Sequence, residues 1–128
     1  MAIPENLRYT KDHTWVLVNG NEATFGITAF AQKRLGDIVF VESPETGKTF
    51  DKDESIGTIE SVKTVIDIFS PLSGEISEVN ESINESPELL NEDPYGEGWI
   101  SKLKITNPNE VKELLTAAEY DNFCKQEA

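Results

Sequence analysis

The chain has 128 residues, of which 38% are hydrophobic and 9% aromatic, a length and composition typical of one domain with its own core. Its 24 acidic side chains against 11 basic ones give a net charge of −13, which would repel phosphate backbones and anionic lipid surfaces. No apolar run approaches the length of a membrane span. From the length, the charge and this absence together we predict one domain over residues 1–128 that binds neither nucleic acid nor membrane.

In the first half of the chain, short alternating apolar and polar runs predict β-strands at residues 15–18, 22–27 and 37–42. A turn signal at residues 19–21 (Asn-Gly-Asn) separates the first two. After the second strand, Thr28 can cap a short helix that runs through Leu35, and Gly36 is placed to end it. We therefore expect two strands, one short helix and a third strand.

The second half continues this pattern, with predicted strands at residues 55–61, 64–69, 74–80 and 99–105. The acidic stretch 80–93 is predicted to be a loop, with one helical turn starting at Ser86. Many short strands separated by turn residues favour a sandwich or barrel-like β architecture.

A helix is predicted near the C-terminus. Asn107, Pro108 and Glu110 supply an N-cap, a first-turn proline and the acidic residue of a capping box. The apolar residues that follow at helical spacing are Val111, Leu114, Leu115 and Ala118. We expect one helix that packs this face on the sheet.

Few side chains could perform chemistry without an attached group. His13 is the only histidine and Cys124 the only cysteine, so the ligands of a His- or Cys-rich metal site are missing. The carboxylates do not follow a calcium-loop spacing, and no Ser-His-Asp set is evident. We therefore predict a scaffold that is not an enzyme and holds no metal, on which chemistry comes from an attached group and from partner enzymes.

Lys63 lies between two predicted strands, where a hairpin should turn. A long side chain in such a turn points away from the sheet. Lysine has a flexible stem and an amine that is nucleophilic when deprotonated. These properties suit the covalent attachment site of a group carrier, which needs reach rather than a pocket. A solvated surface lysine without a function would show the same pattern.

The residues around this lysine form a longer motif. Gly57 precedes the sequence Glu-Ser-Val-Lys at 60–63, and Ser-Pro-Leu-Ser-Gly follows at 70–74. The arrangement resembles the lipoyl-lysine segment of the glycine cleavage system H-protein family. Further matches, in the same order and spacing, cover residues 9–15, 26–32, 35–42, 44–47, 74–80, 98–99 and 119–124. The resemblance therefore covers nearly the whole chain.

The resemblance implies a fold and a cofactor. It implies lipoate bound covalently to Lys63, with Glu60, Ser61 and Val62 as the context that marks the attachment site. It also implies a mainly β, lipoyl-domain-like barrel-sandwich hybrid with short helices and a C-terminal helix. Residues 1–128 would then form a single lipoyl-carrier domain.

The resemblance also implies partners. In the glycine cleavage system the lipoyl group and the lysine that bears it form a long arm. The oxidised arm accepts an aminomethyl group from glycine decarboxylase (P-protein) and passes it to the aminomethyltransferase (T-protein). Dihydrolipoyl dehydrogenase (L-protein) reoxidises the dithiol. We expect these enzymes and lipoate-attaching enzymes as partners of a monomeric carrier. The first residues resemble neither a signal peptide nor a transit peptide, so we expect a cytoplasmic protein, or a mitochondrial-matrix protein if a presequence has been removed.

A cleft in which the loaded arm rests is a further implication. The family commonly has Glu between the residues that match His13 and Trp15, and this chain has Thr14 there. Asp67 matches another expected cleft residue, and Asp12 lies close in sequence. The arm's amine would then contact Asp67, with Thr14 as a neutral partner. Alternatively, Asp67 is an exposed strand acid and the loaded arm is less protected.

Three other functions stay open. A relay protein that supplies its lipoyl group to 2-oxoacid dehydrogenase complexes would share these sequence features. A biotin carrier is disfavoured, because Val62 and Thr64 flank the lysine where that family resembles Met-Lys-Met. An unmodified binding or structural module is the third alternative.

Overall fold

The structure is a computed structural model that describes residues 3–127. The strands are β1 (Arg8–Tyr9), β2 (Thr14–Asn19), β3 (Glu22–Ile27), β4 (Ile38–Glu42), β5 (Thr49–Phe50), β6 (Ser55–Ser61), β7 (Val65–Phe69), β8 (Gly74–Val79) and β9 (Ser101–Ile105). The helices are α1 (Ala29–Leu35), α2 (Ser82–Glu85), α3 (Leu89–Glu92), the 3-10 helix η1 (Pro108–Glu113) and α4 (Ala117–Glu127).

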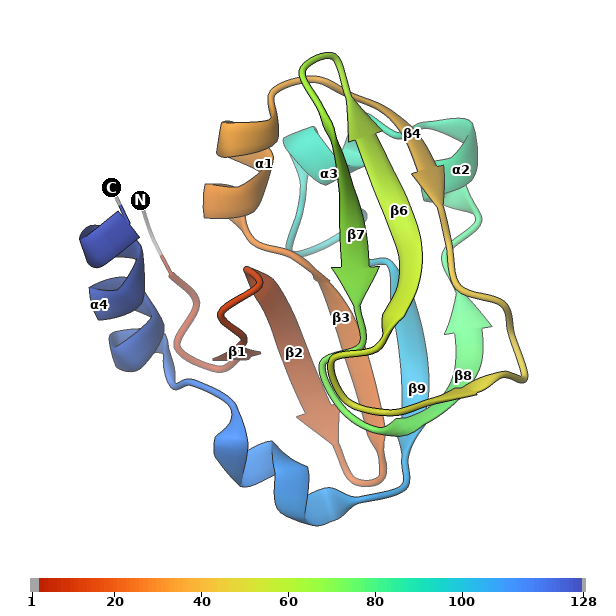
Figure 1. Ribbon diagram of the computed structural model, residues 1–128, viewed down its shortest axis with the longest axis vertical. Helices are drawn as coiled ribbons and strands as arrows, with labels where there is room; N and C mark the ends of the chain where they lie inside the picture. Colours follow the sequence, from red (N-terminus) through yellow and green to blue (C-terminus); the bar gives the residue numbers. More distant parts are fainter. Residues whose placement is uncertain (1–2, 128) are drawn as a thin grey trace.

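Two antiparallel sheets enclose the core. The larger has six strands in the order β1-β2-β3-β9-β8-β5, and the smaller has three in the order β4-β6-β7. Inward side chains of both sheets fill the space between them; Val16, Phe25, Ile59, Ile76 and Leu103 are at most 1% exposed. Figure 1 shows the β6–β7 hairpin extending beyond the rest of the small sheet, beside α1. This is the mainly β architecture that the strand pattern predicts.

Helix α1 begins and ends at the predicted residues. The Thr28 hydroxyl accepts a hydrogen bond from the Ala31 amide at 3.2 Å, which satisfies one free N–H of the first turn. Gly36 ends the helix with φ 75°, a conformation that glycine adopts without a steric penalty. These caps place the α1–β4 connection directly beside the hairpin tip.

A second apolar cluster attaches α4 to the larger sheet. The rings of Tyr9 and Tyr120 stack with centroids 4.6 Å apart, and Trp15 and Cys124 are buried in the same cluster. Figure 1 shows α4 beside β1, at the edge of the larger sheet. The C-terminal helix is therefore held by aromatic packing on β1 and β2.

The predicted single helix from residue 107 onward is wrong. Leu115 forms a β-bridge with Tyr9, with N···O distances of 2.9 and 2.7 Å, and this pairing requires extended backbone between η1 and α4. Glu110 does not complete a capping box; its carboxylate accepts hydrogen bonds from the amide and hydroxyl of Ser73 at 2.7 and 2.8 Å. Two long-range contacts thus override a good local helix pattern.

The predicted loop at residues 80–93 is also more structured than expected. It contains the short helices α2 and α3, anchored by Ile83 and Leu90, both of which are fully buried. The strands β1 and β5 are not predicted either, because two residues are too few to show an alternating pattern. No helix in the described part of the chain is long and apolar enough to cross a membrane.

Candidate functional site

Lys63 lies in the turn that joins β6 to β7, and its side chain is exposed. Ser61 holds this turn. Its amide donates to the Thr64 carbonyl at 2.8 Å, and its hydroxyl oxygen accepts from the amides of Lys63 and Thr64 at 3.1 and 3.2 Å. Because Ser61 is only 5% exposed, these bonds are largely shielded from water. The lysine therefore projects from a rigid turn rather than from a loose loop.

The turn is also fixed to the α1–β4 connection. The Val62 amide donates to the Asp37 carbonyl at 2.9 Å. The stem of Lys63 lies over Gly36, with Cε 3.3 Å from the point that a β-carbon of residue 36 would occupy. A larger residue at position 36 would have to displace the lysine stem.

Asn91 of α3 supports this connection from the side. Its amide nitrogen donates to the Gly36 carbonyl at 2.8 Å and to the Gln32 side chain at 3.0 Å. Its carbonyl oxygen accepts from the Ile38 amide at 2.9 Å. Asn91 thus joins the end of α1 to the start of β4. Sequence reasoning missed it because it lies in a stretch interpreted as an acidic loop.

Two adjoining cavities, of about 440 and about 300 Å³, lie beside the hairpin. We call them together the arm cleft. Both are lined by Asp12, His13, Arg34 and Ile66. The larger also reaches Lys11, Asp67, Phe69 and Glu127, and the smaller Ala31, Leu35 and Thr64. Thr64, in the hairpin turn next to Lys63, lines the smaller cavity. The cleft therefore begins beside Lys63.

The predicted site residues occupy different places. Asp67 and Asp12 line the arm cleft. Thr14 does not; it is 5% exposed, and its amide lies 3.3 Å from the Thr10 hydroxyl oxygen. Glu60 and Val62 are exposed outside the cleft. The structure therefore places both aspartates on the same cavity, whereas Thr14 is buried and does not line it.

Charge is unevenly distributed in the cleft. Partial burial, with repulsion from Asp53, raises the pKa of the Asp12 carboxyl, while His13 and Lys52 act in the opposite direction. The guanidinium of Arg34 faces the same space. The cleft thus combines apolar side chains with the carboxyl groups of Asp12, Asp67 and Glu127 and the cationic side chains of Lys11 and Arg34.

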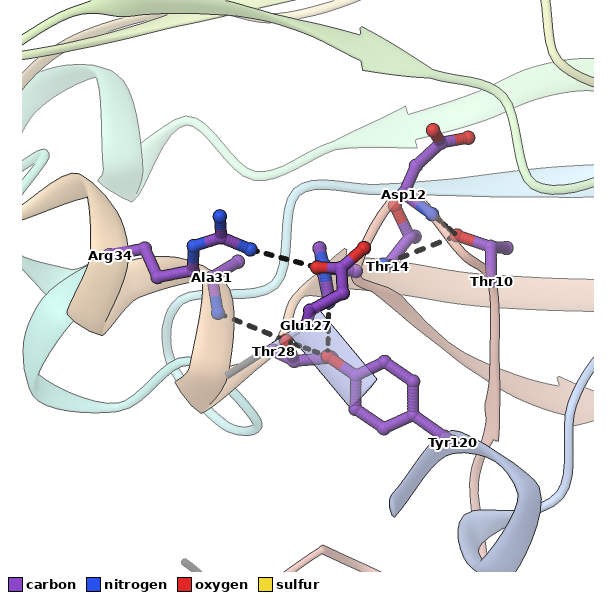
Figure 2. A network of polar contacts seen from close by, with 9 residues as sticks. Thr10, Asp12, Thr14, Thr28, Ala31, Arg34, Tyr120 and Glu127 are labelled. Atoms are coloured by element: carbon purple, nitrogen blue, oxygen red, sulfur yellow. Dashed lines mark hydrogen bonds and ion pairs between the residues drawn. The ribbon is translucent and has the colours of Figure 1, made fainter. Parts of the chain in front are cut away.

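Helix α4 closes one side of the cleft through a chain of polar contacts (Figure 2). Glu127 accepts from His13 Nε2 at 2.9 Å and from Arg34 at 2.8 Å, and these hydrogen bonds, that from His13 foremost, lower the pKa of its carboxyl. The other ring nitrogen of His13 lies 2.8 Å from the Tyr120 hydroxyl, which in turn lies 2.6 Å from the Thr28 hydroxyl. Both nitrogens of His13 therefore contact α4, which they hold against the β1–β2 connection, while Arg34 and Thr28 join α4 to α1 and its N-cap.

This arrangement determines which chemistry the chain can support. His13 has no free ring nitrogen to act as a general base. Within residues 3–127 no group of three or more His, Cys, Asp or Glu side chains is placed to hold a metal ion. What the site offers is an exposed amine on a rigid turn, beside a cleft with room for an attached chain.

Sequence reasoning missed Arg34, Ile66 and Glu127 as cleft residues. They come from α1, β7 and α4, and no local pattern connects these three positions. Only the packing of α4 on the larger sheet brings Glu127 to the hairpin side.

Comparison with known proteins gives consistent results. The model of the family described as glycine cleavage H-protein matches residues 7–127. A glycine cleavage system H protein of Symbiobacterium thermophilum is 53% identical over 124 residues, 97% of each chain. One from Herpetosiphon aurantiacus is 53% identical over 126 residues, 98% of this chain and 96% of that one. The crystal structure of a glycine cleavage system H protein from Mycobacterium marinum has a TM-score of 0.87 at 43% identity, over 94% of this chain and 97% of that one.

Proposed function

The chain belongs to the glycine cleavage H-protein family, and on this premise we propose that it carries a lipoyl group as an amide on Nζ of Lys63. Its role is that of the lipoyl carrier of glycine cleavage, and its fold is lipoyl-domain-like. The observation that most directly supports Lys63 is its exposure on the hairpin turn that Ser61 and Asp37 hold in place.

The residues around Lys63 fit a long, largely apolar group. Lysine stem and lipoyl chain together reach roughly 14 Å by ordinary bond lengths. Amide formation removes the positive charge of the lysine, so the extended arm can lie on apolar surface. Ala31, Leu35 and Ile66 supply such a surface in the cleft that begins beside the turn. A lipoyl group bound there would supply a dithiolane that takes up and releases the aminomethyl group of glycine.

The chain's own part is to position and protect the arm. The bonds at Ser61 and Asp37 fix where the arm starts, and the contacts of Glu127 with His13 and Arg34 keep the cleft wall in place. Asp67 and Asp12 are placed to attract the positive charge of an amine cargo. We assign this contact to the two aspartates and not to Thr14, because Thr14 does not line the cleft.

We expect Asp67→Asn to speed the loss of cargo from the loaded carrier. An exposed charge contact is worth about 0.2–1 kcal/mol, which corresponds to a release rate roughly 1.5 to 5 times that of the wild type. Release of ammonia and formaldehyde from purified loaded protein measures this rate. Asp51→Asn, in an exposed turn outside the cleft, is the control and should leave the rate unchanged. Equal rates for all three proteins would contradict an electrostatic role of Asp67.

The proposal includes partners and a location. The carrier would deliver its arm to the P-, T- and L-proteins as a monomer, after acylation by a lipoate-attaching enzyme. The relatives named above are bacterial, which gives no support to a mitochondrial location, so we place the protein in the cytoplasm. The comparisons give no support to the relay role either.

Mass spectrometry of the native protein tests the proposal. We expect an intact mass increased by one lipoyl group, and peptide mapping should place the whole increase on Lys63. The lipoylated protein, mixed with P-, T- and L-proteins, should then support glycine cleavage. An unmodified mass after expression with a competent ligase and lipoate would refute the carrier assignment, and a biotinyl increment would indicate the other carrier class.

A further inference from the structure

The segment that follows α2 contacts both ends of α1. At the start of the helix, the Tyr95 hydroxyl accepts a hydrogen bond from the Ala29 amide at 3.0 Å. At its end, the Asn91 side-chain amide donates to the Gly36 carbonyl at 2.8 Å. Figure 1 shows α3, the helix that contains Asn91, next to α1. We call residues 89–97 the α1 brace.

The α1 brace is itself fixed to the rest of the fold. Leu90 is fully buried in the core, and the Pro94 carbonyl accepts a hydrogen bond from the ring nitrogen of Trp15 at 2.8 Å. Within the brace, the Asp93 carboxylate accepts a hydrogen bond from the Glu97 amide at 2.9 Å. The brace is therefore a support anchored in the core and on β2, and not a loop that follows α1.

Helix α1 depends on such a support for its direction. It has seven residues, which give about 10 Å of helix, and isolated helices of this length are marginal in water. Tertiary contacts must therefore set the direction of its axis. The contact of Arg34 with Glu127 holds the outer side of the helix at one point, whereas the α1 brace holds both ends. Loss of either end contact would allow the helix to tilt.

The direction of α1 affects two parts of the candidate site. Ala31 and Leu35 of this helix line the part of the arm cleft that begins beside the hairpin turn. The Asp37 carbonyl, which accepts from the Val62 amide at 2.9 Å, lies between the two backbone groups that Asn91 binds. A tilt of α1 would thus move the cleft wall relative to the point at which the arm starts.

We propose that Asn91 and Tyr95 are positioning residues for the lipoyl arm and that they act through α1. This inference rests on the proposed function. Both residues lie outside the arm cleft, so their effect on the arm comes from the helix and the connection that they hold. With α1 held in place, Ala31 and Leu35 keep water from the cleft beside the arm, and this slows the loss of cargo.

The chemistry of its side chain explains why asparagine occupies position 91. The amide supplies two N–H donors, for the Gly36 carbonyl and the Gln32 side chain, and one acceptor, for the Ile38 amide at 2.9 Å. Leucine, of similar volume, would leave the Gly36 carbonyl and the Ile38 amide unpaired. Aspartate would keep only the acceptor for Ile38.

Hydrogen exchange in the unmodified protein tests the positioning directly. The readout is the amide of Val62, which is bonded to Asp37 rather than to Asn91. We expect Asn91→Leu and Asn91→Asp to speed exchange at Val62 about two- to tenfold relative to the Phe25 amide in the larger sheet, the range that corresponds to one lost hydrogen bond. Asn84→Leu, which replaces an exposed asparagine of α2, is the matched control and should leave this ratio unchanged.

The loss of cargo from the loaded carrier is the second readout. Release of ammonia and formaldehyde should be about two- to tenfold faster for Asn91→Leu, and also faster for Tyr95→Phe, which removes only the bond to Ala29. Because Tyr95→Phe leaves Asn91 intact, its Val62 amide should exchange as in the wild type. Tyr9→Phe removes a hydroxyl hydrogen bond of the same kind in the cluster under α4, and it should change neither readout.

The outcomes distinguish positioning from general support of the fold. Exchange that becomes faster by the same factor at Val62 and Phe25 would show that Asn91 contributes only to global stability, and it would overturn the positioning role. Release rates and a Val62 ratio that match the wild type in the Asn91 variants would overturn it as well. A protein that never gains the lipoyl mass would instead refute the proposed function, while the exchange ratio of the unmodified protein would still test the placement of α1.

Discussion

Replacing Lys63 with Arg is expected to abolish acylation and reduce carrier activity to background while leaving the fold intact. Arginine keeps the charge and the length of the stem, but its guanidinium stays protonated at any pH at which proteins are folded and is a poor acyl acceptor. The residue is exposed, and the turn bonds come from Ser61 and from backbone groups, so the substitution removes no packing. Intact mass after incubation with ligase and lipoate measures the first effect, and a reconstituted glycine-cleavage assay the second.

Lys48→Arg is the matched control. Lys48 is also an exposed lysine, close to the turn residue Gly47, and its amine contacts Glu45 at 3.1 Å. This variant should be acylated and active like the wild type. If Lys63→Arg gained the lipoyl mass, or retained substantial carrier activity, the attachment site would have to be another lysine.

The position of the hairpin could be predicted from the sequence because its signals are local. Alternation in the segments on either side of Lys63 indicates two strands, and two strands so close together require a tight turn. The caps of α1 were predictable for the same reason, since Thr28 and Gly36 act on their own helix. Together these local features fix both sides of the lysine-bearing turn.

The features that could not be predicted depend on partners distant in sequence. The break between η1 and α4 arises because Leu115 pairs with Tyr9, and nothing near Leu115 indicates this bridge. Asn91 of α3 makes hydrogen bonds to Gly36 and Ile38 at the α1–β4 connection, which is far from α3 in the sequence. The larger cavity of the arm cleft likewise takes one wall residue, Glu127, from α4, which is far in sequence from the other lining residues. Such contacts belong to the tertiary fold, so no local pattern encodes them.

The structure gives a steric reason for Gly57, which the sequence identifies only as part of the motif around Lys63. It lies in β6, three positions before Glu60, where the register with β7 shifts. A β-carbon built on Gly57 would overlap the carbonyl oxygen of Glu42 in β4 and would lie 3.4 Å from a methyl group of Ile68. The glycine therefore allows the close approach of β4 to β6, and through it supports the sheet that presents Lys63.

Gly57→Ala is accordingly expected to lower the free energy of unfolding by about 3 kcal/mol, the upper part of the usual range for overpacking, because the obstacle is backbone and not a flexible side chain. The midpoint of urea unfolding measures this loss. Gly20→Ala is the control: Gly20 has φ 63° with open space around it, so only backbone strain should appear, at about 1 kcal/mol. Because Gly57 does not share this positive φ, the excess loss at Gly57 reports steric overlap with β4. A loss at Gly57 no larger than that at Gly20 would show that β4 can move away from β6 at little cost, and the motif glycine would then need another explanation.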